Sequence, residues 1–307
     1  MEESGLIFKN WRCRSSQLGK IMTNLISFTE KDKARIEELE SERDTGLNKK
    51  GNKVKKFDET KKPEELQALI KKRDTPDELP TGAKSYLDEV FNDVFWNRKE
   101  TLDNKYLEKG LICEQDVLDL LSKTEKKLYL KNEKRLDDEY TTGCFDTEES
   151  REITDTKANY SKKTFDSAEM NSLYDWQIKD YCRKKGYKKG WLCYGLVNSP
   201  MHHITNEITK MLYATGNPDN DDEKWIETKR QIERNHIFDQ SRFKKEYPYY
   251  VFENKEWKYD IPAQFRIKKF PVEVHEDDSY NIVKRILMSR VYLCQKEREI
   301  RDRMEKL

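Results

Sequence analysis

Hydrophobic and polar positions along the chain predict helices interleaved with strands. Apolar residues spaced three and four apart predict helices at residues 83–96, 104–122, 173–184, 204–213 and 278–306. Alternating or continuous apolar runs predict strands at residues 128–146, 152–158, 191–197 and 265–274. Interleaving of this kind is typical of an α/β domain with a central mixed sheet flanked by helices.

The remaining segments set the expected organisation of the chain. We expect a single domain over residues 1–307, with a catalytic core at about 81–200 and a C-terminal extension of helix and strand at about 201–307. A first helix is predicted through Leu18, Ile21, Met22 and Leu25, with Ser15 or Ser16 as its N-cap. Residues 29–80 form a charged insertion, which is either a DNA-facing arm or a solvated loop. Its basic run contains Lys49, Lys50, Lys53, Lys55 and Lys56.

Composition narrows the class of protein. Sixty Lys and Arg against 59 Asp and Glu give a net charge of +1, which excludes a global surplus of positive charge for binding polyanions. The chain has 16 Tyr, 12 Phe and 6 Trp, too many aromatic residues for a disordered protein. It lacks an apolar stretch of roughly 20 residues, so we expect no membrane partner. Six cysteines without a CxxC pair favour free thiols in the cytoplasm.

A carboxylate interrupts the apolar stripe of the predicted helix at 107–121. Glu114 occupies the place between Leu111 and Leu118, on a stripe that also includes Leu107 and Leu121. A carboxylate facing the core is costly unless it is paired or binds a metal. Glu114 could instead lie at the edge of the stripe and reach solvent. Gly110 lowers helix propensity, which suggests that another group approaches the backbone there.

Further acidic residues follow on the predicted strands. Alternation along 152–158 places Asp155 and Lys157 on one face, where Asp146 can meet them from the preceding strand. Hard oxygen ligands at this density suit Mg²⁺ or Mn²⁺. Lys157 can orient an attacking water or offset charge in the transition state. Gln177 lies on the inward face of the next helix, where it can bond a metal-bound water, a phosphate or simply the sheet.

This ordered pattern resembles the PD-(D/E)XK nuclease superfamily and, within it, the lambda-type (viral recombinase) exonucleases of phages. The matching motifs are Gly110-x3-Glu114, Gly143-x2-Asp146, Asp155-x-Lys157, Gln177 and a strand that closes with Asn198-Ser199-Pro200. The resemblance covers mainly residues 81–200. It departs from the family at Phe145, where proline is usual, and at Asp155, where glutamate is more common. The basic insertion and the C-terminal extension have no counterpart in the motif.

The resemblance implies roles for these residues. Asp146 and Asp155 would ligate Mg²⁺, with Mn²⁺ as a substitute, together with the Thr156 carbonyl. Glu114 would bind or hold a second metal through water. Lys157 would position the nucleophile, and Gln177 would support the motif.

A weaker match at Arg12–Gly19 implies a site for the 5′-phosphate of the digested strand. Arg12 or Arg14 with Ser16 is the expected set, although the spacing from arginine to serine departs from the family. Guanidinium groups near a helix start are a sound phosphate site.

The resemblance further implies a DNA exonuclease that acts on linear double-stranded DNA in recombination or end processing. We expect from the same resemblance a ring-like homo-oligomer and a single-strand annealing protein as partner. For a phage-encoded chain, the expected location is the bacterial host cytoplasm. One alternative is an endonuclease of the same superfamily, which needs no free end. A 5′-phosphate preference that is lost on mutation of Ser16 would favour the exonuclease over this alternative. Another alternative is a non-catalytic DNA-binding or virion protein that keeps the fold. Metal titration of wild type against Asp155→Ala would separate this protein from both nucleases.

Other candidate motifs favour structural roles. Adjacent His202 and His203 are predicted to point in different directions and to lack a carboxylate at ligand spacing, which favours a structural or surface role over metal binding. The basic residues at 183–189 could grip DNA phosphates or form a solvated helix end. The sequence contains no Gly-Lys-Ser/Thr phosphate loop, which disfavours a helicase driven by ATP.

Overall fold

The computed structural model describes residues 5–23, 30–48, 50–53, 56–74, 78–99, 105–216, 218–219 and 222–306. The chain divides into two compact units, one made of Met1–Trp11, Lys20–Asn97 and His275–Leu307 and the other of Arg12–Gly19 and Arg98–Val274. We call them the helical unit and the sheet unit. The expected partition into insertion, core and extension stays a prediction. Leu25, Lys49, Lys55 and Asn104 of the expected elements lie outside the described residues.

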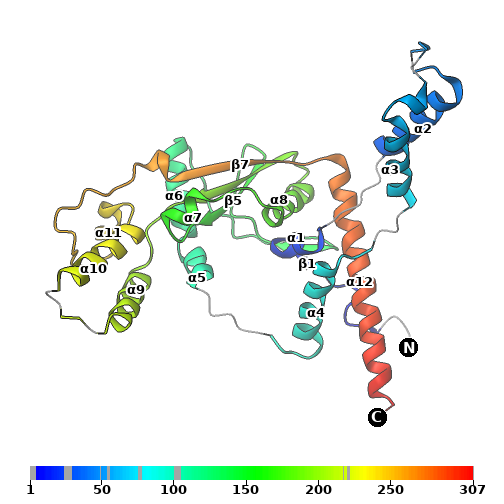
Figure 1. Cartoon of the computed structure of the whole chain (residues 1–307). Helices are drawn as coiled ribbons and strands as arrows, with labels where there is room; N and C mark the ends of the chain where they lie inside the picture. The colour runs from blue at the N-terminus through cyan, green and yellow to red at the C-terminus, as the bar shows by residue number, and fades with distance from the viewer. Residues whose placement is uncertain are drawn as a thin grey trace. The chain divides into compact units, whose positions relative to one another are not determined.

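A four-stranded mixed sheet forms the centre of the sheet unit (Figure 1). Its strands, in spatial order, are β4 (Thr147–Glu149), β5 (Glu152–Ala158), β6 (Lys189–Gly195) and β7 (Ile267–Glu273). β5 runs parallel to β6, and the two outer pairs are antiparallel. A smaller sheet orders β1 (Cys13–Arg14), β3 (Thr141–Gly143) and β2 (Leu136–Asp137). The predicted mixed α/β class is therefore confirmed.

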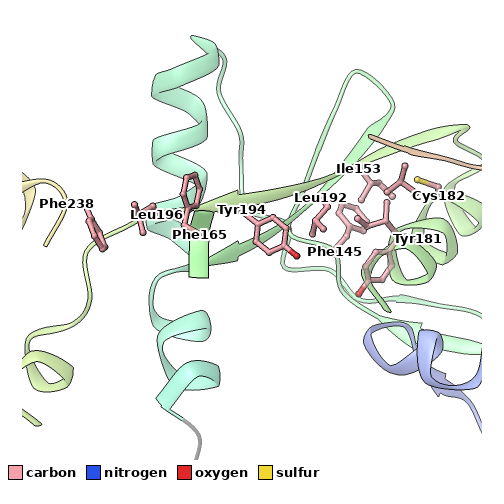
Figure 2. Close-up of a cluster of buried hydrophobic side chains, with 11 residues drawn as sticks. Phe145, Ile153, Phe165, Tyr181, Cys182, Leu192, Tyr194, Leu196 and Phe238 are labelled. Atoms are coloured by element: carbon pink, nitrogen blue, oxygen red, sulfur yellow. The ribbon is translucent and has the colours of Figure 1, made fainter. Parts of the chain in front are cut away.

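Helix α8 (Ser172–Lys185) packs on one face of the central sheet. Its ends are defined locally, because the Asn171 side chain accepts a hydrogen bond from Tyr174 N at 3.1 Å and Gly186 ends the helix with φ of 69°. Figure 2 shows the core under this helix. The buried cluster contains Phe145, Ile153, Phe165, Ile178, Tyr181, Cys182, Leu192, Tyr194, Leu196, Phe238 and Val272.

Helix α6 (Glu114–Glu125) contacts β5, β6 and β7 and buries a second cluster. This cluster brings Val117, Leu118 and Leu121 together with Cys193 and Val197. Val117 fits because β6 has a glycine beneath it: a Cβ on Gly195 would lie 2.6 Å from Val117 Cγ1. The six cysteines are free thiols, as expected, and all but Cys144 are buried.

The single helix predicted over 104–122 is wrong. The chain forms α5 (Lys105–Ile112) and then α6, with the break at Cys113. The continuous stripe is lost, since Leu107 is 61% and Leu111 76% exposed. The inference from Gly110 is also wrong, because no described atom lies within 4 Å of a Cβ built there.

The N-cap predicted at Ser15 or Ser16 is wrong as well. Both serines lie inside the short 3-10 helix η2 (Ser15–Gln17), whose N-cap is Arg14, and α1 (Leu18–Ile21) follows directly.

The remaining elements of the sheet unit are mostly helical. They are α7 (Lys162–Asp166), α9 (Met201–Ala214), α10 (Glu223–His236), α11 (Gln240–Glu246) and η4 (Ala263–Phe265). A separate cluster of Ile204, Ile232, Ile237 and Phe243 packs α9, α10 and α11 together.

The helical unit contains α2 (Glu30–Thr45), η3 (Phe57–Glu59), α3 (Lys62–Asp74), α4 (Thr81–Phe95) and α12 (Glu276–Met304). Asp88 of α4 accepts hydrogen bonds from Tyr292 at 2.8 Å and Lys296 at 2.6 Å, both on α12. The charged insertion forms a helix pair, α2 and α3, around Leu39 and Leu66. Among the described residues, no helix has the length and apolar character that crossing a membrane requires.

Candidate active site

Asp155 lies at the centre of the candidate active site. Alternation along β5 turns Asp155 and Lys157 toward α8, on the same face as buried Ile153. Asp155 is 1% exposed, and its two carboxylate oxygens have different partners. Oδ1 accepts a hydrogen bond from Gln177 Nε2 at 3.0 Å, and Oδ2 accepts one from Lys157 Nζ. The structure thus brings together three residues that the sequence pattern predicted.

Asp146 reaches the same site from the start of β4. The antiparallel register pairs Thr147 with Thr154, so Asp146 continues the strand opposite Asp155. Because β4 begins only at Thr147, the backbone N–H of Thr156 donates its hydrogen bond to a side chain and not to a backbone carbonyl of β4. Thr156 N donates to Asp146 Oδ2 at 2.5 Å, and Thr156 Oγ1 donates to the same oxygen at 2.7 Å. Both bonds orient the Asp146 carboxylate.

Phe145, the departure from the family motif, has a packing role. It is 5% exposed, and its ring meets Tyr181 edge to face with centroids 6.0 Å apart. Packing of Phe145 in the core therefore fixes the position of the next residue, Asp146.

Glu114 lies near the site, but its position in the helix differs from the one predicted. It is the first residue of α6, its side chain is 22% exposed, and its Oε1 lies 3.2 Å from Lys131 Nζ. It does not replace a leucine on a buried stripe, since that stripe is broken at Cys113. Its negative charge nevertheless contributes to raising the pKa of Asp155.

The electrostatics of the cluster favour a bound cation. Burial raises the pKa of Asp155 to about 7; Lys157 opposes this shift, and the charges of Asp146 and Glu114 add to it. Burial alone would lower the pKa of Lys157, but Asp155 and Asp146 outweigh it and raise that pKa above its usual value. Two aspartates and a glutamate beside one half-buried lysine are a donor set that fits a divalent metal with oxygen ligands.

Two tyrosines on α8, Tyr174 and Tyr181, support this cluster. Tyr181 Oη donates to Cys144 O at 2.9 Å and lies 3.4 Å from Gln177 Nε2. The Lys157 ammonium lies 5.0 Å from the centroid of the Tyr174 ring. Their spacing from Gln177, three residues before and four after, was the available signal.

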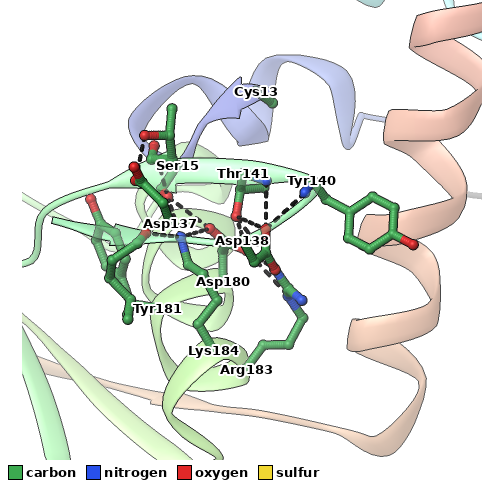
Figure 3. A network of polar contacts seen from close by, with 12 residues as sticks. Cys13, Ser15, Asp137, Asp138, Tyr140, Thr141, Asp180, Tyr181, Arg183 and Lys184 are labelled. Atoms are coloured by element: carbon green, nitrogen blue, oxygen red, sulfur yellow. Dashed lines mark hydrogen bonds and ion pairs between the residues drawn. The ribbon is translucent and has the colours of Figure 1, made fainter. Parts of the chain in front are cut away.

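The expected phosphate residues lie around β1 and η2. Arg12, Arg14 and Ser16 are all exposed, and Arg12 Nη1 lies 3.9 Å from Asp137 Oδ2. Ser15 is the inward serine. Its Oγ donates to Asp180 Oδ2 at 2.7 Å and accepts from Lys184 Nζ at 3.1 Å (Figure 3).

A buried polar network extends from Ser15 to α8. Asp180 is fully buried and accepts hydrogen bonds from Thr141 Oγ1 at 3.0 Å and Arg183 Nη2 at 2.9 Å (Figure 3). Lys184 Nζ lies 3.0 Å from Asp180 Oδ2. Arg183 and Lys184 therefore belong neither to a solvated helix end nor to a free basic patch. They join η2 and β3 to the helix that carries Gln177.

Two expectations about His202 and His203 are wrong, that the rings point in different directions and that they lack a carboxylate, while their structural or surface role stays a prediction. The rings lie together at the start of α9 with centroids 4.4 Å apart. Both nitrogens face a carboxylate, since His202 Nε2 is 3.1 Å from Glu108 Oε1 and His203 Nε2 is 3.3 Å from Glu108 Oε2. Glu108 is 94 residues away in the sequence from His202 and belongs to another helix, so local spacing gave no signal for it.

The mixed sheet, the acidic residues on β5 and before β4, and the inward glutamine on α8 lie together in one α/β core. A scan against protein-family models and a search of curated proteins both gave no match.

Among solved structures, the chain is similar to a phage-related exonuclease from Haemophilus somnus 129PT, with 16% identity and a TM-score of 0.55 over 95% of this chain and 97% of that one. An alkaline exonuclease (LHK-Exo) from Laribacter hongkongensis has 8% identity and a TM-score of 0.45, over 74% of this chain and 87% of that one. LHK-Exo in complex with dAMP has 9% identity and a TM-score of 0.42, over 74% and 86%. The first similarity confirms, for the fold, the resemblance to phage exonucleases.

Proposed function

We propose that the protein is a metal-dependent deoxyribonuclease, an exonuclease that acts on linear double-stranded DNA. The observation that carries this proposal is the buried cluster in which Asp155 accepts hydrogen bonds from both Gln177 and Lys157, next to Asp146. This cluster lies in a fold shared with a phage-related exonuclease. An acidic residue with a perturbed pKa, paired with a specific charged partner, is typical of functional sites.

Asp146 and Asp155 are the proposed metal ligands, with the Thr156 carbonyl beside them and Glu114 holding a second ion through water. Mg²⁺ is the proposed cofactor and Mn²⁺ its substitute, since both prefer carboxylate and carbonyl oxygens. When bound, such ions lower the pKa of water and stabilise the attacking and leaving oxygens of a phosphodiester.

The chain's own residues orient this chemistry. Lys157 stays protonated because Asp155 and Asp146 raise its pKa. Its ammonium is therefore available to position the nucleophilic water or to offset negative charge as it develops on the phosphate. Gln177 fixes Asp155 through Oδ1, and Thr156 fixes Asp146 through Oδ2. Outer partners of this kind set the orientation of metal ligands.

Exposed Arg12, Arg14 and Ser16 are the proposed contacts to the 5′-phosphate of the substrate. Their guanidinium and hydroxyl groups are suited to binding phosphate oxygens. They are attached to β1 and η2, which the network around Asp180 holds against α8. A homo-oligomer that encloses DNA, an annealing protein as partner and a cytoplasmic location complete the proposal.

The test compares wild type with Lys157→Ala on 5′-phosphorylated linear duplex and on closed circular duplex, with Mg²⁺ and with a chelator. Lys163→Ala is the matched control, because Lys163 is an exposed lysine on α7 soon after β5. We expect wild type and the control to degrade linear DNA only, in a metal-dependent manner. Lys157→Ala should lose this activity while its circular dichroism spectrum is unchanged.

Other outcomes select the alternatives. Cleavage of the circle would make the protein an endonuclease with the same site. DNA binding by folded wild type without cleavage of either substrate, at any Mg²⁺ or Mn²⁺ concentration, would indicate a non-catalytic DNA-binding protein. Full activity of Lys157→Ala would refute the role assigned to the cluster.

A further inference from the structure

A second group of metal-binding side chains lies outside the candidate active site. It consists of Glu108 on α5 with His202 and His203 at the start of α9, and its ligand atoms all lie within 4.8 Å of one another. It shares no residue with the Asp146, Asp155 cluster. We call it the histidine cluster.

His203 provides an observation that points to a bound ligand. The residue is 3% exposed, and its Nε2 has no hydrogen-bond partner among the described residues. That nitrogen lies 3.3 Å from Glu108 Oε2 without the alignment of a hydrogen bond. A buried polar atom without a partner is costly and calls for an explanation. A metal ion between His203 and Glu108 would provide it.

The distances fit coordination by one ion. Ligand atoms about 2.0–2.1 Å from a tetrahedral Zn²⁺ lie roughly 3.3 Å from each other. The two nitrogen–oxygen separations are 3.1 Å from His202 Nε2 to Glu108 Oε1 and 3.3 Å from His203 Nε2 to Glu108 Oε2, so each imidazole has this spacing from one oxygen of the carboxylate. The donor set of two imidazoles and one carboxylate suits zinc and neighbouring transition metals, whereas Mg²⁺ prefers oxygen ligands only.

Among the described residues, neighbouring lysine side chains do not pair with the Glu108 carboxylate. The two lysines whose charges act on His203 bind other groups: Lys105 Nζ donates to Glu207 at 2.6 Å. Lys109 Nζ donates to the carbonyls of Tyr160 and Val197 and to Ser199 Oγ, at 3.0–3.1 Å.

The cluster also borders open space. Glu108 and His203 line a cavity of about 490 Å³. Three protein ligands leave a fourth position for water or for an external ligand on the cavity side.

We propose that Glu108, His202 and His203 form a second metal site, which binds Zn²⁺ or a similar transition-metal ion. The ion would join α5 to α9 and so tie the segment before the acidic helix α6 to the segment after β6. This site is chemically distinct from the oxygen-ligand site proposed for Mg²⁺.

The test is calorimetric titration of the full chain with Zn²⁺ in excess Mg²⁺, with Co²⁺ as a spectroscopic probe. The variants His202→Gln and Glu108→Gln change side chains that are 48% and 49% exposed, so the fold should tolerate them. His275→Gln is the matched control, because it removes an exposed histidine outside the cluster. Asp155→Asn tests independence from the candidate active site.

We expect one Zn²⁺ equivalent in wild type, His275→Gln and Asp155→Asn, with visible Co²⁺ absorption and a higher melting temperature in Zn²⁺. His202→Gln and Glu108→Gln should bind at least about tenfold more weakly and lose both signals. Absence of saturable Zn²⁺ binding in wild type would overturn the proposal. Equal binding by His202→Gln, or loss of binding in Asp155→Asn, would overturn it too, by placing the ion elsewhere.

Discussion

The buried carboxylate of Asp180 offers a sharp test of how the N-terminal segment is held on α8. We consider Asp180→Ala. The change removes one carboxylate that accepts from Ser15, Thr141 and Arg183 and lies 3.0 Å from the Lys184 ammonium. Asp180 is fully buried and the Lys184 side chain is 3% exposed, so water cannot replace the lost partner. The variant leaves a buried cation without its counter-charge.

Removal of one partner from a buried ion pair typically costs about 3–5 kcal/mol. The lower end applies here, because each cation keeps another partner. Arg183 still bonds Asp138, and Lys184 still donates to Leu136 O at 2.9 Å. We therefore expect Asp180→Ala to lower the free energy of unfolding by about 3 kcal/mol.

Urea unfolding followed by tryptophan fluorescence measures this loss, since four of the six tryptophans (Trp176, Trp191, Trp225 and Trp257) lie in the sheet unit. Asp175→Ala is the matched control on the same helix. Asp175 pairs with Lys179 at 3.1 Å, four residues on, with a side chain 29% exposed, and its loss should cost under about 1 kcal/mol. Equal stability of the two variants would refute the importance assigned to the network. If Arg14 contacts the 5′-phosphate as proposed, folded Asp180→Ala should also degrade 5′-phosphorylated and 5′-hydroxyl ends at more similar rates than wild type, because β1 carries Arg14.

Three further predictions concern pH, packing and the metal ligands. Burial lowers the pKa of His236 to about 4 from its ordinary 6.5, so the unfolded chain binds the proton first. The contribution of His236 to the free energy of unfolding is therefore complete above pH 6.5 and falls by about 3 kcal/mol on acidification to pH 4. His236→Gln should remove this pH dependence when urea unfolding is measured as a function of pH. Gly190→Ala should cost about 1–3 kcal/mol in the same assay, because its Cβ would lie 2.4 Å from Ile178 Cγ2; unchanged stability would contradict this close packing. Gln177→Leu should raise the Mg²⁺ concentration for half-maximal cleavage about 10–100-fold by releasing Asp155, and an unchanged Mg²⁺ curve would exclude that role.

Much of the central sheet and of its acidic cluster was predictable from local pattern. The strand predicted at 152–158 is β5, and its period of two was enough to place Asp155 and Lys157 on one face. The helix after it was predictable because its apolar stripe repeats every three to four residues and ends near Gly186. Gln177 faces Asp155 for that reason. These features depend on backbone geometry within one element, which a sequence expresses directly.

Contacts between distant elements were decided only by the tertiary structure. The sequence around Cys113 continues a helical pattern without proline, and Gly110 lies inside α5, yet the helix breaks three residues later, where Cys113 is buried against Asn198. Which serine turns inward depended on Asp180, 165 residues from Ser15.

The meeting of His202 and His203 with Glu108 depended in the same way on the packing of α9 beside α5. The sequence by itself thus determined the strand β5 and the helix α8 and which of their side chains share a face. The tertiary structure decided which faces meet, because burial and pairing across long separations leave no local periodic signal.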